Sequence, residues 1–291
     1  MVSMSDRLRP VPQALTREAD VVAALDRLGQ APAGGSPDQA SLLPASGLLA
    51  MSIPERFGGA DISNLVVAEA VSRLMAWSAA AADRLLKHLV ALELVRTSGS
   101  TEQRKVIYGR VVLGDAFELA APGKGAALPR LVQSGLAFTL EQEGSGPTVG
   151  SADWQIVMAS AAGSEPVAVI LDHARMSLRD ELAAPGLTVH PDYILSPGAN
   201  ADCLARLMTA FLKAATARGH GGAGPRTGAT DAALAVEREL LDAMIHKAAA
   251  FIDGIQVDDP PIDLAQIDRF CLALDTARLR CSADHSPAIR S

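Results

Sequence analysis

The glycine-rich stretch of residues 219–225 is the first place where spacing alone suggests chemistry. Gly219, Gly221 and Gly224 match the pattern GxGxxG, which binds the phosphates of a dinucleotide. That site needs a strand before the glycines, whereas a helical pattern precedes them here. A P-loop would need a lysine where Pro225 stands. We therefore interpret this stretch as a flexible connector.

Acidic residues and histidines that could act as acids, bases or ligands do not form a recognisable set. Glu237 and Glu239 lie two residues apart in a helical pattern, which places them on different helix faces. His88 is either a polar contact in a substrate cleft or a structural histidine. His246 has no partner at HxxxH spacing. No catalytic residue is identified, and no metal site is expected.

The potential nucleophiles and single cations give no stronger signal. Ser145 has glycines directly on both sides, which is not the GxSxG spacing of a nucleophile elbow. Lys124 between glycines is either an anion contact or a turn residue. The cysteines lack the CxxC spacing of a zinc site, and we expect them to be free thiols: Cys203, Cys271 and Cys281.

An apolar run that ends in a proline and a double glycine is the most specific pattern in the chain. It covers residues 47–60, and a helical pattern follows from residues 61–63. Pro54 fixes the direction of the backbone. Gly58 and Gly59 allow a turn where a Cβ atom would clash. We expect a buried segment that turns sharply into a helix.

Helical periodicity dominates residues 1–115. Helices are expected over about 17–28, just before Gly47, over 64–80 with Ser63 or Asp61 as N-cap, over 82–96, and from a capping box at Ser100 and Gln103 to about Gly114. Their inward stripes include, in chain order, Val21, Val22, Leu25, Leu28, Val66, Val67, Ala70, Leu74, Trp77, Leu85, Leu86, Leu89, Leu92, Val95, Val106, Ile107 and Val111.

The apolar pattern then changes to that of short strands. Strands are expected at 117–119, 136–140, 154–159 and 167–171, and a turn into another strand at 185–189. Helical stripes return around residues 204–212, 234–252 and 267–281. The predicted fold class is α+β, with an N-terminal helical domain (1–115), a small β domain (116–195) and a C-terminal helical bundle (196–291).

Composition limits the classes of partner. Hydrophobic residues make up 49% of the 291 residues, which is enough for a sizeable core. The net charge is −7 and no basic patch with interleaved aromatic residues occurs, so nucleic-acid binding is not expected. No apolar run approaches the length of a membrane span, and no signal-peptide pattern occurs at the N-terminus. We expect a cytoplasmic protein.

Four segments together resemble the acyl-CoA dehydrogenase superfamily. Residues 46–64 match "SGL…VP..(Y/F)GGA..SN", and residues 88–93 are similar to an "H…(L/V)E" helix. Residues 99–114 match "GS.EQ….(F/Y)….L.G", and residues 184–189 match "APGLTV". Within the superfamily the chain looks most like the branch of reduced-flavin monooxygenases and sulfur-acquisition oxidoreductases related to dibenzothiophene monooxygenase.

The resemblance implies a flavin, FAD or FMN, between the β region and the C-terminal helices. The residues that would contact it, mainly through the backbone, are Leu119, Ala120, Ala121, Gly125 and Thr148. It also implies an acyl thioester or an organosulfur-like substrate and an oligomer, formed with identical subunits or with a homologue.

The same segments depart from the family pattern at the expected flavin site. The flavin strand usually reads "(A)LTEP.AGSD", and here Ala120 replaces the hydroxyl and Ala121 the acid. Since flavin chemistry needs donors near the ring, two hypotheses stay open. The chain is either a flavin-dependent oxidoreductase or a shortened, degenerate homologue that has lost its cofactor and acts as a binding or assembly partner.

Overall fold

The computed structural model describes residues 11–30, 39–120, 127–141, 152–161, 165–173, 186–198, 200–220, 229–258 and 261–283. Helical segments are α1 (Glu18–Gly29), α2 (Gln39–Ser46), η1 (Leu48–Ala50), η2 (Glu55–Phe57), α3 (Asn64–Trp77), α4 (Ala79–Ser98), α5 (Thr101–Val112), η3 (Pro191–Tyr193), α7 (Ala201–His220), α8 (Ala229–Asp258) and α9 (Leu264–Ala283). Strands are β1 (Phe117–Leu119), β2 (Arg130–Ser134), β3 (Ala137–Glu141), β4 (Trp154–Ala161), β5 (Val167–Asp172), β6 (Leu187–Val189) and β7 (Ile194–Leu195).

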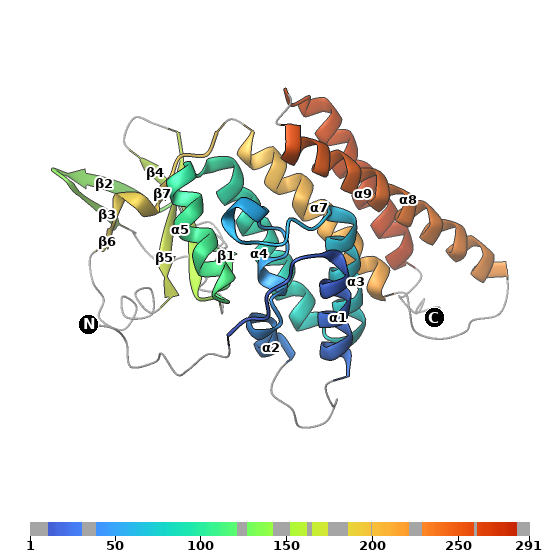
Figure 1. The fold of residues 1–291 in the computed structure, drawn as a ribbon. Helices are drawn as coiled ribbons and strands as arrows, with labels where there is room; N and C mark the ends of the chain where they lie inside the picture. Colours follow the sequence, from blue (N-terminus) through green and yellow to red (C-terminus); the bar gives the residue numbers. More distant parts are fainter. Residues whose placement is uncertain are drawn as a thin grey trace, which may run out of the picture. The chain divides into compact units, whose positions relative to one another are not determined.

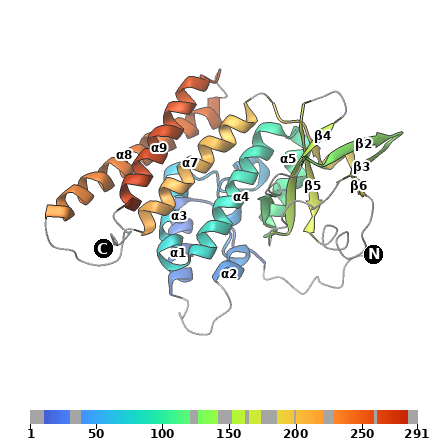
Figure 2. The same ribbon diagram turned by 180° about the vertical axis from the view of Figure 1, so that it is seen from behind.

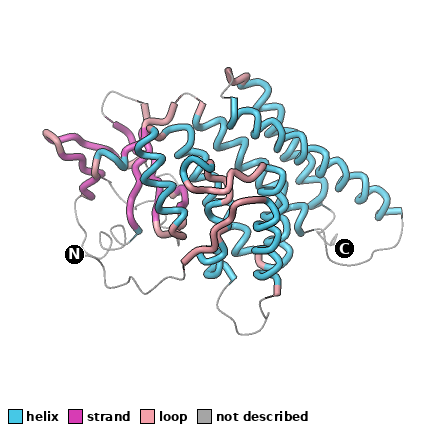
Figure 3. Tube along the Cα trace, viewed as in Figure 1, coloured by secondary structure: helices cyan, strands magenta, loops and turns pink. Residues whose placement is uncertain are grey.

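The order of these elements, helices then strands then helices, confirms the predicted α+β fold class (Figures 1 and 3). Contacts group the chain into two compact units. One unit combines residues 1–86 with residues 206–291, and the other consists of residues 87–205. The division into segments 1–115, 116–195 and 196–291 stays a prediction. None of the described helices is long and apolar enough to cross a membrane.

The helical unit brings the two ends of the sequence together. Helix α3 packs on α1 and α8, and α8 and α9 run side by side (Figure 2). Arg218 at the end of α7 links these helices, because its guanidinium lies 2.6 Å from Glu69, 3.1 Å from the Ser72 hydroxyl and 3.6 Å from Asp242. Their facing sides are aliphatic, so hydrophobic burial is the main force that holds this unit together.

Most predicted inward positions are buried, but Val22, Trp77 and Val106 are exposed. Trp77, the last residue of α3, is 36% exposed. Val22 and Val106 are 42% and 51% exposed. Each follows or precedes a buried position by one residue, and one residue rotates the side chain by about 100° around a helix. The real stripes pass through Val21 and Ile107 instead.

The sequence predicts one helix over residues 64–80, but in the structure this segment is interrupted at Ser78. Its backbone is extended, and its hydroxyl accepts a hydrogen bond from the N–H of Ala81. Ser78 therefore caps the start of α4 at residue 79, three residues earlier than expected.

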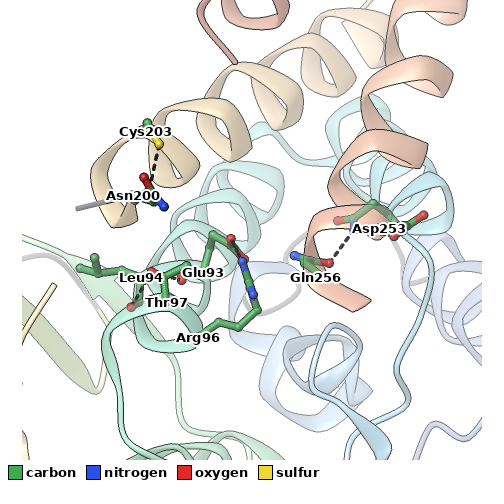
Figure 4. A network of polar contacts seen from close by, with 9 residues as sticks. Glu93, Leu94, Arg96, Thr97, Asn200, Cys203, Asp253 and Gln256 are labelled. Carbon is green, nitrogen blue, oxygen red and sulfur yellow. Dashed lines mark hydrogen bonds and ion pairs between the residues drawn. The ribbon is translucent and has the colours of Figure 1, made fainter. Parts of the chain in front are cut away.

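The cap of α3 comes from a different helix. Ser63 is the N-cap residue, but its hydroxyl donates to Glu18 and makes no capping hydrogen bond. Instead Asp253 on α8 accepts hydrogen bonds from the backbone N–H of Asn64 (3.0 Å) and from its side-chain amide (2.7 Å). Gln256 accepts a second bond from that amide; Figure 4 includes Asp253 and Gln256. A carboxylate close to the positive end of α3 is favourable. The prediction of Ser63 as the N-cap residue is confirmed, although the side chain that accepts the capping hydrogen bond is that of Asp253.

The proline and double-glycine turn forms as expected. Gly58 has φ 85°, a conformation that side chains other than glycine rarely adopt. A Cβ atom on Gly59 would lie 2.1 Å from the carbonyl oxygen of Ile53. The chain then folds back, with the N–H of Asp61 donating to that carbonyl.

The second unit contains one mixed sheet with strand order β6-β3-β2-β4-β5-β7, and β1 pairs with β4 outside this path. The β1–β4 and β2–β4 pairs are parallel and the others are antiparallel. Inward residues of β2 to β6 form one apolar cluster, which holds the sheet in register: Leu131, Leu140, Val157, Ala159, Val169, Leu171 and Val189.

Strands β2 and β7 were not predicted. In β2 only Leu131 is buried, and most of the other residues are charged or polar, so the strand has no apolar alternation. Strand β7 is two residues long, which is too short to show a pattern. Leu136, expected to start a strand, lies in the turn between β2 and β3 and is 94% exposed.

We predict that Asp253→Ala lowers the free energy of unfolding by about 1–2 kcal/mol, because α3 loses its cap and Asn64 loses a buried partner. Chemical denaturation measures the change. The matched control is Asp268→Ala, which breaks an exposed ion pair with Arg206 and should cost about 0.5 kcal/mol or less. Equal losses in the two variants would contradict the assignment of the cap.

Candidate functional site

The predicted flavin-contacting residues fall only in part within the described structure. Leu119 ends strand β1, and Ala120 follows it with its N–H donating to the carbonyl of Ile156 on β4. Both residues are partly buried. Ala121, Gly125 and Thr148 lie outside the described residues, as do Lys124 and Ser145. The site can therefore be built from β1 and the groups that position it.

Strand β1 is held at its start by a completely buried histidine. The Nδ1 atom of His88 on α4 accepts a hydrogen bond of 2.9 Å from the N–H of Phe117. An acceptor at Nδ1 requires the neutral ring with its proton on Nε2. Of the two roles left open for His88, the structure shows the structural one. His88 binds the N–H of Phe117, which points away from β4.

The residues just before β1 and β4 lock the two strands to each other. Asp153 accepts a hydrogen bond from the N–H of Ala116, and Asp115 accepts one from the indole N–H of Trp154. The N–H of Trp154 in turn donates to the carbonyl of Ala116. These three bonds fix the register in which Phe117 lies opposite Trp154.

Aromatic rings cover one face of this strand pair. Trp154 stacks on Phe117 at 5.9 Å between ring centroids and on Tyr193 at 5.6 Å. The guanidinium of Arg110 on α5 lies 5.5 Å from the centre of the indole. In a chain with only 3% aromatic residues, this stack marks a point where the backbone is rigidly positioned.

Gln103 joins α5 to the segment that carries Tyr193. It completes the predicted capping box with Ser100, which the structure confirms. Its side-chain amide also donates to the carbonyls of Asp192 (3.2 Å) and Ile194 (2.9 Å). A glutamate would complete the box equally well but has no N–H to donate, which explains the amide at this position.

The opposite face of the β1–β4 pair is polar at its start. Glu118 on β1 forms an ion pair of 3.1 Å with Lys87, and its side chain is only 14% exposed. Gln155 lies opposite Glu118 in the parallel register and is fully buried. Sequence reasoning missed both residues. The only available signal was a glutamine inside an otherwise apolar strand.

A buried ion pair supports the middle of α4. Arg96 donates to both carboxylate oxygens of Glu93, at 2.9 Å and 2.8 Å, and the Thr97 hydroxyl donates to the carbonyl of Glu93 (Figure 4). Glu93 was noted in the sequence only as part of the "H…(L/V)E" helix. Its charge is compensated within α4, so this pair is structural.

The remaining candidates from the sequence do not assemble into a site. Glu237 is partly buried and Glu239 exposed, in line with their different helix faces, and His246 is exposed. All three cysteines are free thiols, and burial raises the pKa of Cys281, which weakens it as a nucleophile. Helix α7 extends to His220 and contains Gly219, so a helix and not a strand leads into the glycines, while residues 221–225 lie outside the described part.

The described residues around β1 provide backbone hydrogen-bonding groups, the carboxylate of Glu118 in its ion pair with Lys87, and the buried amide of Gln155. In that part of the chain no three histidine, cysteine or acidic side chains gather to hold a metal ion. Any redox chemistry at this strand would depend on a bound group that the residues position.

Comparison with solved structures shows the same fold in several flavin enzymes. Dibenzothiophene monooxygenase from Paenibacillus sp. A11-2, crystallised with FMN and indole, has 17% sequence identity and a TM-score of 0.68 over 92% of this chain and 82% of that one. Methanesulfinate monooxygenase from Pseudomonas fluorescens has 17% identity and a TM-score of 0.65 over 91% and 81%. XiaF from Streptomyces sp., crystallised with FADH2 and glycerol, has 14% identity and a TM-score of 0.67 over 94% and 86%. No protein-family model and no curated protein sequence matches the chain.

We predict that His88→Leu destabilises the protein by about 1–3 kcal/mol, because the buried N–H of Phe117 loses its acceptor. Denaturant titration followed by circular dichroism measures this change. His246→Leu on exposed α8 is the control and should shift stability by about 0.5 kcal/mol at most. A loss no larger than the control's would show that the hydrogen bond is not needed.

For Gln103→Glu we expect a loss of about 1 kcal/mol, since the capping box survives while two carbonyls face a carboxylate without a donor. The neighbouring change Glu102→Gln provides the control, with an expected effect of about 0.3 kcal/mol through the helix dipole. Thermal unfolding of both variants decides the point; an unchanged midpoint for Gln103→Glu would refute the role of the amide.

Proposed function

We propose that this protein is a flavin-dependent oxidoreductase of the reduced-flavin monooxygenase type. The observation that carries the proposal is the match of fold over more than nine-tenths of the chain to enzymes whose structures contain FMN or FADH2. Strand β1 stands at the place in the sequence where the acyl-CoA dehydrogenase superfamily has its flavin strand. FMN and FAD both remain candidates for the cofactor.

The described residues fit a flavin at the end of β1. Within the described structure β1 pairs with β4 along one edge only, and Phe117 uses its outward N–H for His88. The next outward backbone group is that of Leu119, beside the small and partly exposed Ala120. Such a strand end can offer backbone hydrogen bonds to a planar heterocycle, and the alanine methyl holds it against the apolar cluster of the sheet.

A bound flavin would supply the exchange of electrons with a small-molecule substrate or with oxygen. The chain's own residues would hold and orient it. The backbone N–H of Leu119 would bind the ring, and His88 together with Asp153 would keep the strand fixed, while the N–H of Ala120 is bonded to Ile156 on β4. A dehydrogenase base is not identified, which favours a monooxygenase acting on an organosulfur-like compound over a dehydrogenase acting on an acyl thioester.

A cofactor-free assembly partner is the second candidate function. Ala120 lacks the hydroxyl that the family strand offers, and aliphatic side chains are exposed on the α8–α9 pair: Val236, Leu240, Leu272 and Leu279. Such residues could bind an identical subunit or a homologue.

Flavin titration separates the two candidates. We expect the purified protein to bind FMN or FAD, oxidised or reduced, with saturable quenching of flavin fluorescence. Ala120→Leu should weaken this binding at least about tenfold, because the larger side chain does not fit against the apolar cluster and displaces the backbone that would hold the ring. The matched control is Ala137→Leu on the exposed face of β3, which should bind like the unmodified protein.

Absence of binding to every form of both flavins would overturn the proposed function in favour of the cofactor-free partner. If Ala120→Leu and the unmodified protein bind flavin equally well, the flavin site does not include the end of β1.

A further inference from the structure

Helix α8 has two apolar rows of side chains, and the helical unit buries one of them. The inward row packs through residues such as Leu241, Ile245 and Ile252, none of which is more than 4% exposed. A second row follows the outward side at alternating spacings of three and four residues. This row, named the α8 seam, consists of Ala233, Val236, Leu240, Ala243, Lys247, Ala250, Gly254 and Val257.

The α8 seam is open to solvent along its length. Its members are exposed except Gly254, which is partly exposed and where an added Cβ atom would meet open space. The large apolar side chains that α8 exposes all belong to the seam: Val236 (55%), Leu240 (48%) and Val257 (81%). Alternating spacings of three and four residues are typical of a coiled coil, in which two helices bury such rows against each other.

The order of large and small residues makes the α8 seam complementary to itself. When two antiparallel copies overlap along the whole seam, the first member of one faces the last member of the other, and so on inward. Every layer then places a larger side chain against a smaller one, which lets two helices pack closely. The pairs, each formed twice by symmetry, are Ala233–Val257, Val236–Gly254, Leu240–Ala250 and Ala243–Lys247.

We propose that the α8 seam binds the α8 seam of a second copy of this chain, antiparallel and around a two-fold axis near Ile245. Since the seam complements its own order of side chains, an identical chain fits it better than a homologue with a different order. The inference concerns a surface other than the proposed flavin site and does not depend on flavin binding.

Lys247 provides charge complementarity in the same arrangement. Its aliphatic stem packs over the small Ala243 of the second copy. Glu239 of that copy lies one turn further along its helix, about 6 Å away and within reach of a lysine side chain. Both side chains are exposed in the described structure. Two symmetric ion pairs between Lys247 and Glu239 thus favour this register, as single polar residues in a seam often do.

Leu240→Glu in the full-length protein tests whether the seam is the interface. Sedimentation measures association, and circular dichroism verifies that the variant is folded. We expect the unmodified protein to dimerise and the variant to have a dissociation constant at least about tenfold higher, because a carboxylate would be buried opposite Ala250. The matched control is Leu113→Glu after α5, another exposed leucine (66%), which should associate like the unmodified protein.

A charge exchange tests the ion pairs separately from folding. Lys247→Glu should weaken the dimer, because it places like charges next to each other across the interface. Adding Glu239→Lys to the same chain should restore the dimer, since the pair is then present with its charges exchanged.

Cysteine cross-linking tests the antiparallel register. The double variant Leu240→Cys and Ala250→Cys should form disulfide-linked dimers on oxidation, because these positions face each other between copies. Within one helix they lie about 15 Å apart, too far for a disulfide. The same distance separates each position from its own copy, so neither single variant should cross-link beyond the level of the unmodified protein with its three native cysteines.

A monomeric unmodified protein, or a dimer that Leu240→Glu leaves intact, would overturn the inference. Equal cross-linking by a single variant and the double variant would contradict the antiparallel arrangement, and so would failure of Glu239→Lys to rescue Lys247→Glu. Each of these results leaves the proposed flavin function untouched, because that function is tested by flavin titration.

Discussion

Strand β1 consists of three residues and, among the residues that the structure describes, pairs with one strand, so its position depends on hydrogen bonds from outside the sheet. The bond from the N–H of Phe117 to His88 is the central one, because it satisfies a buried donor that β4 does not reach. Asp153 and the stacked ring of Trp154 fix the same strand from its other side. The backbone of Leu119 and Ala120 thus ends a well-anchored segment, as a binding site requires.

Several polar side chains fix the ends of secondary-structure elements. Asp253 caps α3, and Gln103 joins α5 to the carbonyls before and within β7. Backbone groups at such ends lack partners within the element itself, so each of these contacts satisfies a group that would otherwise be open.

The sequence predicts the fold class and most helices because their apolar stripes are long. It also predicts the turn at Gly58 and Gly59, since those glycines are required by the backbone. It does not predict the cap of α3, because Asp253 is 189 residues away from Asn64 and no local pattern connects them. Strand β2 escapes detection because its pairing with β3 and β4, rather than its own apolar content, makes it a strand.

The candidate site is only partly readable from the sequence for a related reason. Leu119 and Ala120 were found through a resemblance in the motif, and the structure places them at the end of β1 as a pair. The role of His88 and the burial of Gln155 depend on which strand or backbone group lies opposite them, which only the assembled sheet shows. Ala121, Gly125 and Thr148 stay predictions.

The central claim is that a flavin binds at the end of β1, and amide hydrogen exchange tests it most directly. Exchange of the amide of Leu119 is compared with and without saturating FMN or FAD, with α9 as a reference. The account predicts slower exchange at this amide when flavin is present and no change in α9. Saturable flavin binding with unchanged exchange at Leu119 would contradict it.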